Sequence, residues 1–205
     1  MLARGTACIM REIIPGVLTW SKLSDRFGYD FNGFLVRDVA IDPVEMDDET
    51  LERLAKERVE RIVLTNRNHY RDVEKLRKRT GAKVAVHTAD AAWVRGKGVT
   101  VDETLVAGEK VGPFVVLAAA GKSPGEVALH WPARKLLIVG DACVGPKPGE
   151  LGLLPAAAID DLPALKKSLE QLLTVDFDAL LLADGHSILT GGKAALAKLV
   201  ATFHA

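Results

Sequence analysis

Four short polar segments contain the side chains that could do chemistry, and each of them directly follows an apolar run. Residues 66–71 (NRNHYR) follow RIVLT, residues 121–125 (GKSPG) follow VVLAAA, residues 140–143 (GDAC) follow LLIV, and residues 184–187 (DGHS) follow LLLA. Loops at the ends of buried strands are where a rigid scaffold presents functional groups. A single polar turn of this kind usually only reverses the chain, so the prediction of a site rests on all four segments together.

Apolar periodicity predicts the strands and helices that must position these segments. Apolar residues between 51 and 59 recur at helical spacing, and Asp47 or Asp48 can cap that helix. A second helix through Val73 and Leu76 ends at Gly81, a residue type that is typical just after a helix. The sequence further predicts strands over 61–65, 83–87 and 178–183 and a meander of strands over 99–139. It also predicts a loop over 140–155, a helix capped by Asp160, and a last helix over 193–203. This mixture favours two packed sheets with helices on the outside.

The order of the polar motifs resembles that of the metallo-β-lactamase superfamily. That family places HxHxDH after a strand, then a histidine in a short turn, then GD, and then GH after the last core strand. This sequence reads NRNHYR, GKSPGE, VGDAC and DGHS at the corresponding places, and FNGFLV and AIDP are similar to the family's opening strands. The resemblance implies an α+β fold, namely a four-layer αββα sandwich of two mixed sheets with helices outside, and a single domain over residues 1–205.

The resemblance also implies which residues stand at the family's metal-ligand positions. The bridging aspartate, Asp141, and the final histidine, His186, match the family's ligands. The other positions hold different residue types, namely Asn66, Asn68, Tyr70, Arg71 and Lys122. An amide is a weak zinc ligand, and a guanidinium or a protonated ammonium offers no usable lone pair. Because catalytic zinc generally takes three protein ligands and a water, the resemblance implies that two-metal hydrolysis is lost.

These replacements bring two cations near a carboxylate. We expect Arg71 and Lys122 to form an internal ion-pair network with Asp141, in which His186 could take part, because a buried carboxylate without a partner is costly. His69 lies one residue away from the family's ligand positions and is expected to be a turn histidine bonded to backbone or solvent. The alternative is that His69, Asp141 and His186 together hold one metal ion.

Composition limits the partners and the compartment. The 27 Lys and Arg balance the 27 Asp and Glu, so no net charge draws the protein to nucleic acid or to an acidic membrane. No apolar run reaches the roughly 20 residues of a membrane span, and the sequence shows no signal peptide, hence we predict a cytoplasmic protein. Cys8 and Cys143 lack CxxC spacing, which fits a reducing compartment, and Cys143 is expected to be a small buried hydrophobe. The sequence is compatible with a homo-oligomer and does not decide the oligomeric state.

Two functions are compatible with these residues. The first is a protein without cofactor that serves as a binding or assembly module, with a small molecule as a candidate ligand. The second is a hydrolase, which would use one weakly held zinc or iron, or would work without metal through Asp141, His186 and Lys122 as acid–base groups. The small number of remaining ligands favours the first function, and the metal content of the purified protein discriminates between them.

Overall fold

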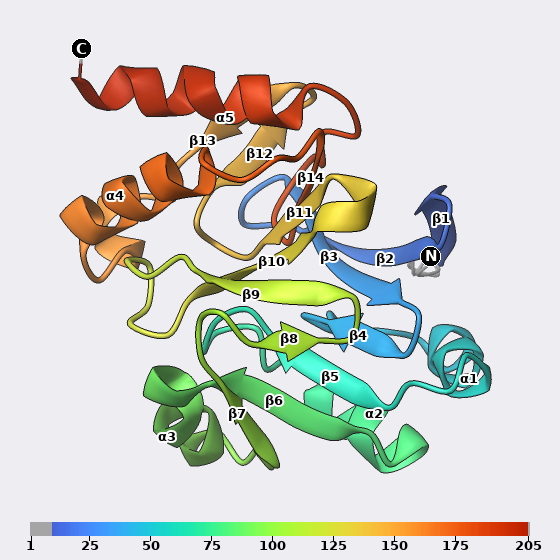
Figure 1. Cartoon of the computed structure of the whole chain (residues 1–205). Coiled ribbons are helices and arrows are strands. Elements are labelled where there is room, and N and C mark those ends of the chain that lie inside the picture. Colours follow the sequence, from blue (N-terminus) through green and yellow to red (C-terminus); the bar gives the residue numbers. More distant parts are fainter. Residues whose placement is uncertain (1–9, 205) are drawn as a thin grey trace.

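The computed structural model describes residues 10–204, which form two mixed β-sheets packed face to face (Figure 1). The first sheet has the order β1 (Arg11–Ile14), β2 (Val17–Ser24), β3 (Tyr29–Val36), β4 (Val39–Ile41), β5 (Arg61–Leu64), β6 (Lys83–His87) and β7 (Glu103–Leu105). The second has the order β14 (Ala179–Leu182), β11 (Leu136–Val139), β10 (Val127–Trp131), β9 (Phe114–Ala118) and β8 (Lys110–Val111). Strands β1 to β4 pair antiparallel, β4 to β7 pair parallel, and in the second sheet β11 and β14 pair parallel while the other neighbours are antiparallel.

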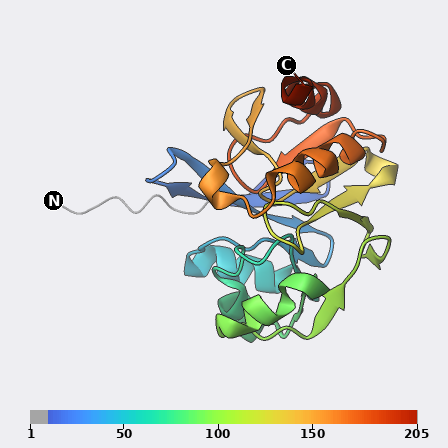
Figure 2. The ribbon, with the colours of Figure 1, turned by 90° about the vertical axis from the view of Figure 1, so that its left-hand side faces the viewer.

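Helices cover the outer face of each sheet. The first sheet carries α1 (Asp48–Lys56), α2 (Val73–Thr80) and α3 (Thr88–Gly96), and the second carries α4 (Leu162–Leu172) and α5 (Gly192–Ala201). Figures 1 and 2 show the two groups of helices on opposite sides of the molecule. The predicted α+β sandwich with αββα layers is therefore confirmed. No helix in the described part of the chain is long and apolar enough to cross a membrane.

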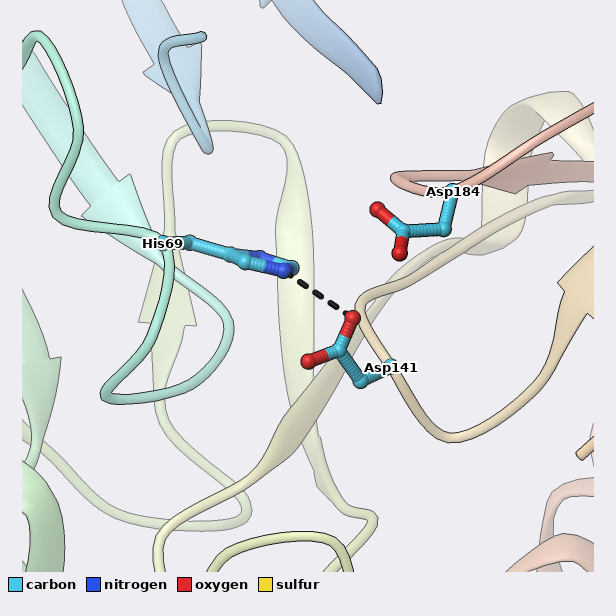
Figure 3. Close-up of side chains that lie close together, drawn as sticks. All are labelled: His69, Asp141 and Asp184. Atoms are coloured by element: carbon cyan, nitrogen blue, oxygen red, sulfur yellow. Dashed lines mark hydrogen bonds and ion pairs between the residues drawn. The ribbon is translucent and has the colours of Figure 1, made fainter. Parts of the chain in front are cut away.

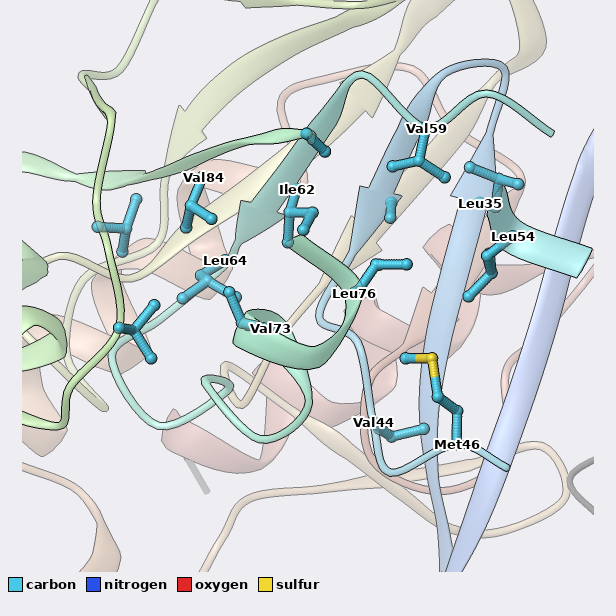
Figure 4. Close-up of a cluster of buried hydrophobic side chains, with 14 of the residues drawn as sticks. Leu35, Val44, Met46, Leu54, Val59, Ile62, Leu64, Val73, Leu76 and Val84 are labelled. Atoms are coloured by element: carbon cyan, nitrogen blue, oxygen red, sulfur yellow. The ribbon is translucent and has the colours of Figure 1, made fainter. Parts of the chain in front are cut away.

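The period-two alternation of strand side chains creates the inner layers. In β5, Ile62 and Leu64 pack toward the helices, whereas Val63 lies between the two sheets. On the helix side these residues join a cluster with Leu54 of α1 and Leu76 of α2 (Figure 4). Because both faces of these strands are buried, their sequence is continuously apolar.

A third buried cluster separates the second sheet from its helices. Leu137 and Leu180 of that sheet pack with Leu165 and Leu169 of α4 and with Leu196 of α5. The two sheets and the two helix layers are thus held by three apolar interfaces, and each of them buries side chains that would otherwise meet water.

Local hydrogen bonds decide where the helices begin. Asp47 caps α1, and Asp161 instead of the predicted Asp160 caps α4, because each side chain accepts the backbone amide hydrogen three residues later. Asp160 pairs with Arg67 at 2.7 Å. Helix α3 was not predicted, and its cap is the imidazole of His87, which is not one of the usual capping types.

The segment predicted as a loop over 140–155 also contains regular structure. It forms a hairpin of β12 (Val144–Lys147) and β13 (Glu150–Gly152). Gly149, with φ of 77°, makes the turn between them, since the left-handed conformation favours glycine. Single-turn helices η1, η2 and η3 lie at Pro132–Arg134, Ala156–Ala158 and Thr202–His204.

Candidate functional site

The four polar segments predicted as the site converge in the structure. One cavity of about 350 Å³ is lined by Asn68, Lys122, Asp141 and Asp184, one residue from each segment. The segments with Asn68, Asp141 and Asp184 directly follow β5, β11 and β14. The β2–β3 hairpin and the residues around η2 complete the wall of this cavity, which we call the edge cavity.

A chain of four charged side chains lies beside the edge cavity. Nδ1 of His69 is 3.0 Å from Oδ2 of Asp42, and Nε2 of His69 is 3.1 Å from Oδ1 of Asp141. The other oxygen of Asp141 is 2.6 Å from Nζ of Lys122. Figure 3 shows the imidazole directed at the Asp141 carboxylate. We call Asp42, His69, Asp141 and Lys122 the ion chain.

The charges along the ion chain alternate in sign. Burial by itself lowers the pKa of His69, but the carboxylates of Asp42 and Asp141 outweigh burial and raise that pKa to about 10. Burial alone would raise the pKa of Asp141, yet His69 and Lys122 hold it below its usual range. A protonated imidazole and an ammonium therefore balance two carboxylates, and the predicted ion pair of Lys122 with Asp141 is present.

This arrangement corrects the expectation for His69. The side chain is 1% exposed and contacts two carboxylates, so it is not a turn histidine bonded to backbone or solvent. Asp42 at the end of β4 is a site residue that sequence reasoning missed, although AIDP places a carboxylate at a strand end. It also accepts hydrogen bonds from the backbone amide (2.8 Å) and hydroxyl (2.6 Å) of Thr65, which fixes the turn that carries His69.

Asp90 of α3 fixes two of the polar segments to each other. Its fully buried carboxylate accepts hydrogen bonds from the backbone amide of Arg67 at 2.9 Å, the hydroxyl of Ser123 at 2.6 Å and the backbone amide of Gly125 at 3.1 Å. The turn that carries His69 and the turn that carries Lys122 are thereby held in register. The absence of a predicted helix over α3 explains why this residue was missed.

Asp184 faces the ion chain, and His186 does not. The side chain of Asp184 is 4% exposed and lines the edge cavity, whereas His186 is exposed and lines a different one. The reversal comes from Gly185, whose φ is 89°, and from Gly145, which bonds the backbone on both sides of that glycine. Burial, followed by the charge of Asp141, raises the pKa of Asp184 to about 7.

Arg71 does not join the expected ion-pair network, and Tyr70, which stands at a family ligand position, does not line the edge cavity. The guanidinium of Arg71 stacks over the ring of Phe31 at 4.1 Å and forms no ion pair with Asp141 among the described residues. Its Nη1 atom is buried and has no hydrogen-bond partner among residues 10–204. The ring of Tyr70 packs on Trp93 instead, with centroids 5.7 Å apart.

A buried polar layer lies behind Asp141. Glu126 is 1% exposed, and burial followed by the charge of Asp141 raises its pKa well above the usual range. Asn66 is fully buried, and a Cβ at Gly140 would lie 3.0 Å from both Nδ2 of Asn66 and Oε1 of Glu126, and would overlap Oγ1 of Thr65. Glycine is therefore required directly before Asp141.

Cys143 fulfils the expectation of a small buried hydrophobe. It is fully buried in the cluster between the second sheet and its helices, and burial followed by the charge of Glu126 raises the pKa of its thiol to about 12. Cys8 lies outside the described residues.

Three described residues lie close enough to share one metal ion. His69, Asp141 and Asp184 each offer a ligand atom, and these atoms lie within 4.8 Å of one another (Figure 3). Two of the three belong to the ion chain, and the third faces it from the strand end after β14.

The αββα layers, together with polar loops that converge at the strand ends, define this as a protein of the metallo-β-lactamase fold class. The sequence profile of the metallo-beta-lactamase superfamily matches residues 10–203. The chain therefore belongs to the metallo-beta-lactamase superfamily. No curated protein matches it.

Solved structures agree with this assignment. The metallo-beta-lactamase from Pontibacter korlensis superposes with a TM-score of 0.76 at 16% identity, over 94% of this chain and 98% of that one. FIM-1 from Pseudomonas aeruginosa, solved in its mono-zinc form, gives 0.75 at 16% identity over 96% of both chains. TTHA1623 in a di-iron-bound form gives 0.63 at 22% identity, over 93% and 97%. At such low identities these likenesses show the fold alone.

Proposed function

We propose that this protein is a metal-independent binding module, in which the ion chain replaces the metal centre of the fold class and the edge cavity receives a small molecule. The observation that carries the proposal is the contact series from Asp42 through His69 and Asp141 to Lys122, with distances of 3.0, 3.1 and 2.6 Å. These contacts engage both ring nitrogens of His69 and both carboxylate oxygens of Asp141, two of the three residues that could share a metal ion.

The chemistry of the donor set argues against a metal ion. Both ring nitrogens of His69 face carboxylates, and a pKa of about 10 means that both carry protons at neutral pH. A metal would need a deprotonated imidazole, so the proton that the two carboxylates stabilise on His69 opposes metal binding. It would also have to displace the ammonium of Lys122 from Asp141, because both oxygens of that carboxylate are engaged. His69, Asp141 and Asp184 as they stand do not fit zinc or iron.

A second candidate function is metal-free acid–base hydrolysis at Asp184. Its pKa of about 7 is suited to a group that accepts and returns a proton near neutral pH. In this candidate Asp184 takes the place that sequence analysis gave to His186, because His186 lies outside the edge cavity. Hydrolysis of a thioester, lactone or phosphodiester by metal-free protein, lost in Asp184→Asn and kept in His186→Gln, would establish it.

Metal analysis tests the main proposal. Protein expressed in zinc-supplemented or iron-supplemented medium, purified without chelator and measured by elemental analysis, is expected to hold far less than one metal ion per chain. The control variant Lys122→His replaces the ammonium beside Asp141 with an imidazole, and should bind more zinc than the wild type if the cation excludes metal. Stoichiometric metal in the wild type that disappears in His69→Ala would refute the proposal.

A further inference from the structure

The edge cavity contains a buried acceptor and a buried donor whose partners are not supplied by the described residues. Oδ1 of Asp184 and Nη1 of Arg71 are both buried without a hydrogen-bond partner there, and both residues line the cavity. Asp184 is 96% buried, given its 4% exposure. Since buried polar groups in folded proteins are almost always paired, two such atoms on one cavity wall indicate a ligand with complementary groups.

Charge at the cavity wall points to the acidic part of that ligand. Lys122 and Asp141 neutralise each other within the ion chain, so they add no net charge. The remaining charged residues of the lining are two arginines, Arg26 and Arg71, and one carboxylate, Asp184. The cavity wall therefore has a net charge of +1 when Asp184 is ionised. A planar guanidinium that is already stacked on Phe31 is suited to bind a carboxylate.

The rest of the wall is apolar and suits a small organic group. Phe27 and Phe31 lie on the hairpin side, while Leu154, Pro155 and Ala158 lie on the side of η2. The volume of about 350 Å³ is at the lower end of the range for small-molecule sites.

We propose that the edge cavity binds a small organic acid that carries a hydroxyl or amino group beside its carboxylate. The carboxylate contacts Arg71, the adjacent hydroxyl or amino group donates to Asp184, and the organic group lies against Phe31. This inference rests on the proposed binding function, and it names the class of ligand.

Matched aromatic acids test each part of this recognition. Mandelate carries a carboxylate and a hydroxyl, phenylglycine replaces the hydroxyl with an amino group, phenylacetate lacks the adjacent donor, and mandelamide lacks the acid. Calorimetric titration with and without EDTA should show the same binding of mandelate or phenylglycine, and the stronger of the two tells whether a hydroxy acid or an amino acid is preferred. The affinity for phenylacetate and for mandelamide should be lower by about tenfold or more, because each leaves a buried charged group of the protein unpaired.

Two variants connect the affinity to the named atoms. Arg71→Gln should lower the affinity for mandelate by about tenfold or more, since it removes a charge-assisted hydrogen bond. The control Arg134→Gln removes an arginine that also stacks on an aromatic ring, Trp131 at 5.5 Å, but does not line the cavity, and it should leave the affinity unchanged. Asp184→Asn should reduce the preference for phenylglycine over phenylacetate, because it removes the negative charge that faces the ammonium.

The possible results separate this inference from the proposed function. The inference is overturned if neither mandelate nor phenylglycine binds at millimolar concentration, if phenylacetate binds as tightly as both, or if Arg71→Gln has no more effect than Arg134→Gln. The proposed function is overturned separately if the purified protein holds stoichiometric zinc or iron, or if binding of the acids disappears with EDTA. A metal-free protein that binds none of the acids contradicts only the ligand class.

Discussion

Replacing Lys122 with methionine removes one end of the ion chain while keeping an unbranched side chain of similar length. Lys122 lies 2.6 Å from Asp141, and both side chains are only 6% exposed. Removal of one partner from a buried ion pair leaves an uncompensated charge and typically costs about 3–5 kcal/mol. Asp141 keeps its contact with His69 at 3.1 Å, so we expect the lower end of that range, about 3 kcal/mol.

Thermal and urea unfolding measure this loss directly. For a chain of this size, about 3 kcal/mol corresponds to a decrease in Tm of roughly 6–12 °C. The matched control is Arg79→Met, because Arg79 also lies 2.6 Å from its partner, Glu52, while these side chains are 45% and 50% exposed. Since the two distances are equal and the control pair is exposed to solvent, Arg79→Met should destabilise the protein far less than Lys122→Met.

The double variant Lys122→Met/Asp141→Asn distinguishes a lost ion pair from a packing defect. If the cost of Lys122→Met comes from the uncompensated carboxylate, neutralising Asp141 should recover part of it, with a coupling free energy of about 1–3 kcal/mol. Equal destabilisation by Lys122→Met and Arg79→Met, or strict additivity in the double variant, would refute the role that we assign to the ion chain.

Three further predictions concern titration and reactivity. The pKa of His69 in the folded protein is raised to about 10 from 6.5. The protonated imidazole therefore stabilises the fold fully below pH 6.5, and this stabilisation is lost as pH rises through about 10. NMR titration of the imidazole should find it still protonated at pH 8. The pKa of Asp184 is raised to about 7 from 3.8, so its ionisation destabilises the fold as pH rises through this interval, and Asp184→Asn should increase Tm at pH 8 but not at pH 3; an equal change at both values would contradict this assignment. In a Cys8→Ser variant, the thiol of Cys143 should react with a disulfide reagent at pH 8 only after unfolding, and rapid reaction of the native protein would contradict its burial.

The layers of the fold could be predicted because they depend on features that sequence displays directly. The apolar runs that form β5 and β14 are buried on both faces, and Gly81 ends α2 with φ of 76° as its residue type indicates. The hairpin of β12 and β13 was missed because it is short and its strands contain glycine and proline, which weaken any strand pattern.

The composition of the site could be predicted only in part, because turns do not preserve the alternation that strands impose. Periodicity placed Asp141 and His186 at strand ends, yet Gly185 reverses the chain and leaves Asp184 in the edge cavity. The inward position of His69 depends on Asp42, which precedes it by 27 residues in sequence. Such a contact is set by the pairing of β4 with β5, and a pattern read along one segment does not contain it.

The ion chain and the edge cavity separate stability from recognition. Within the ion chain, each charged group faces one of opposite sign, so these four residues contribute to stability mainly through contact with one another. Asp184 and Arg71 instead have buried atoms that no residue between 10 and 204 pairs, which costs folding free energy and is useful only if a ligand supplies the missing partners. Variants of Lys122 should therefore act chiefly on unfolding, and variants of Arg71 chiefly on binding. A protein in which both groups of variants changed stability alone would have a structural polar core at this edge and no ligand site.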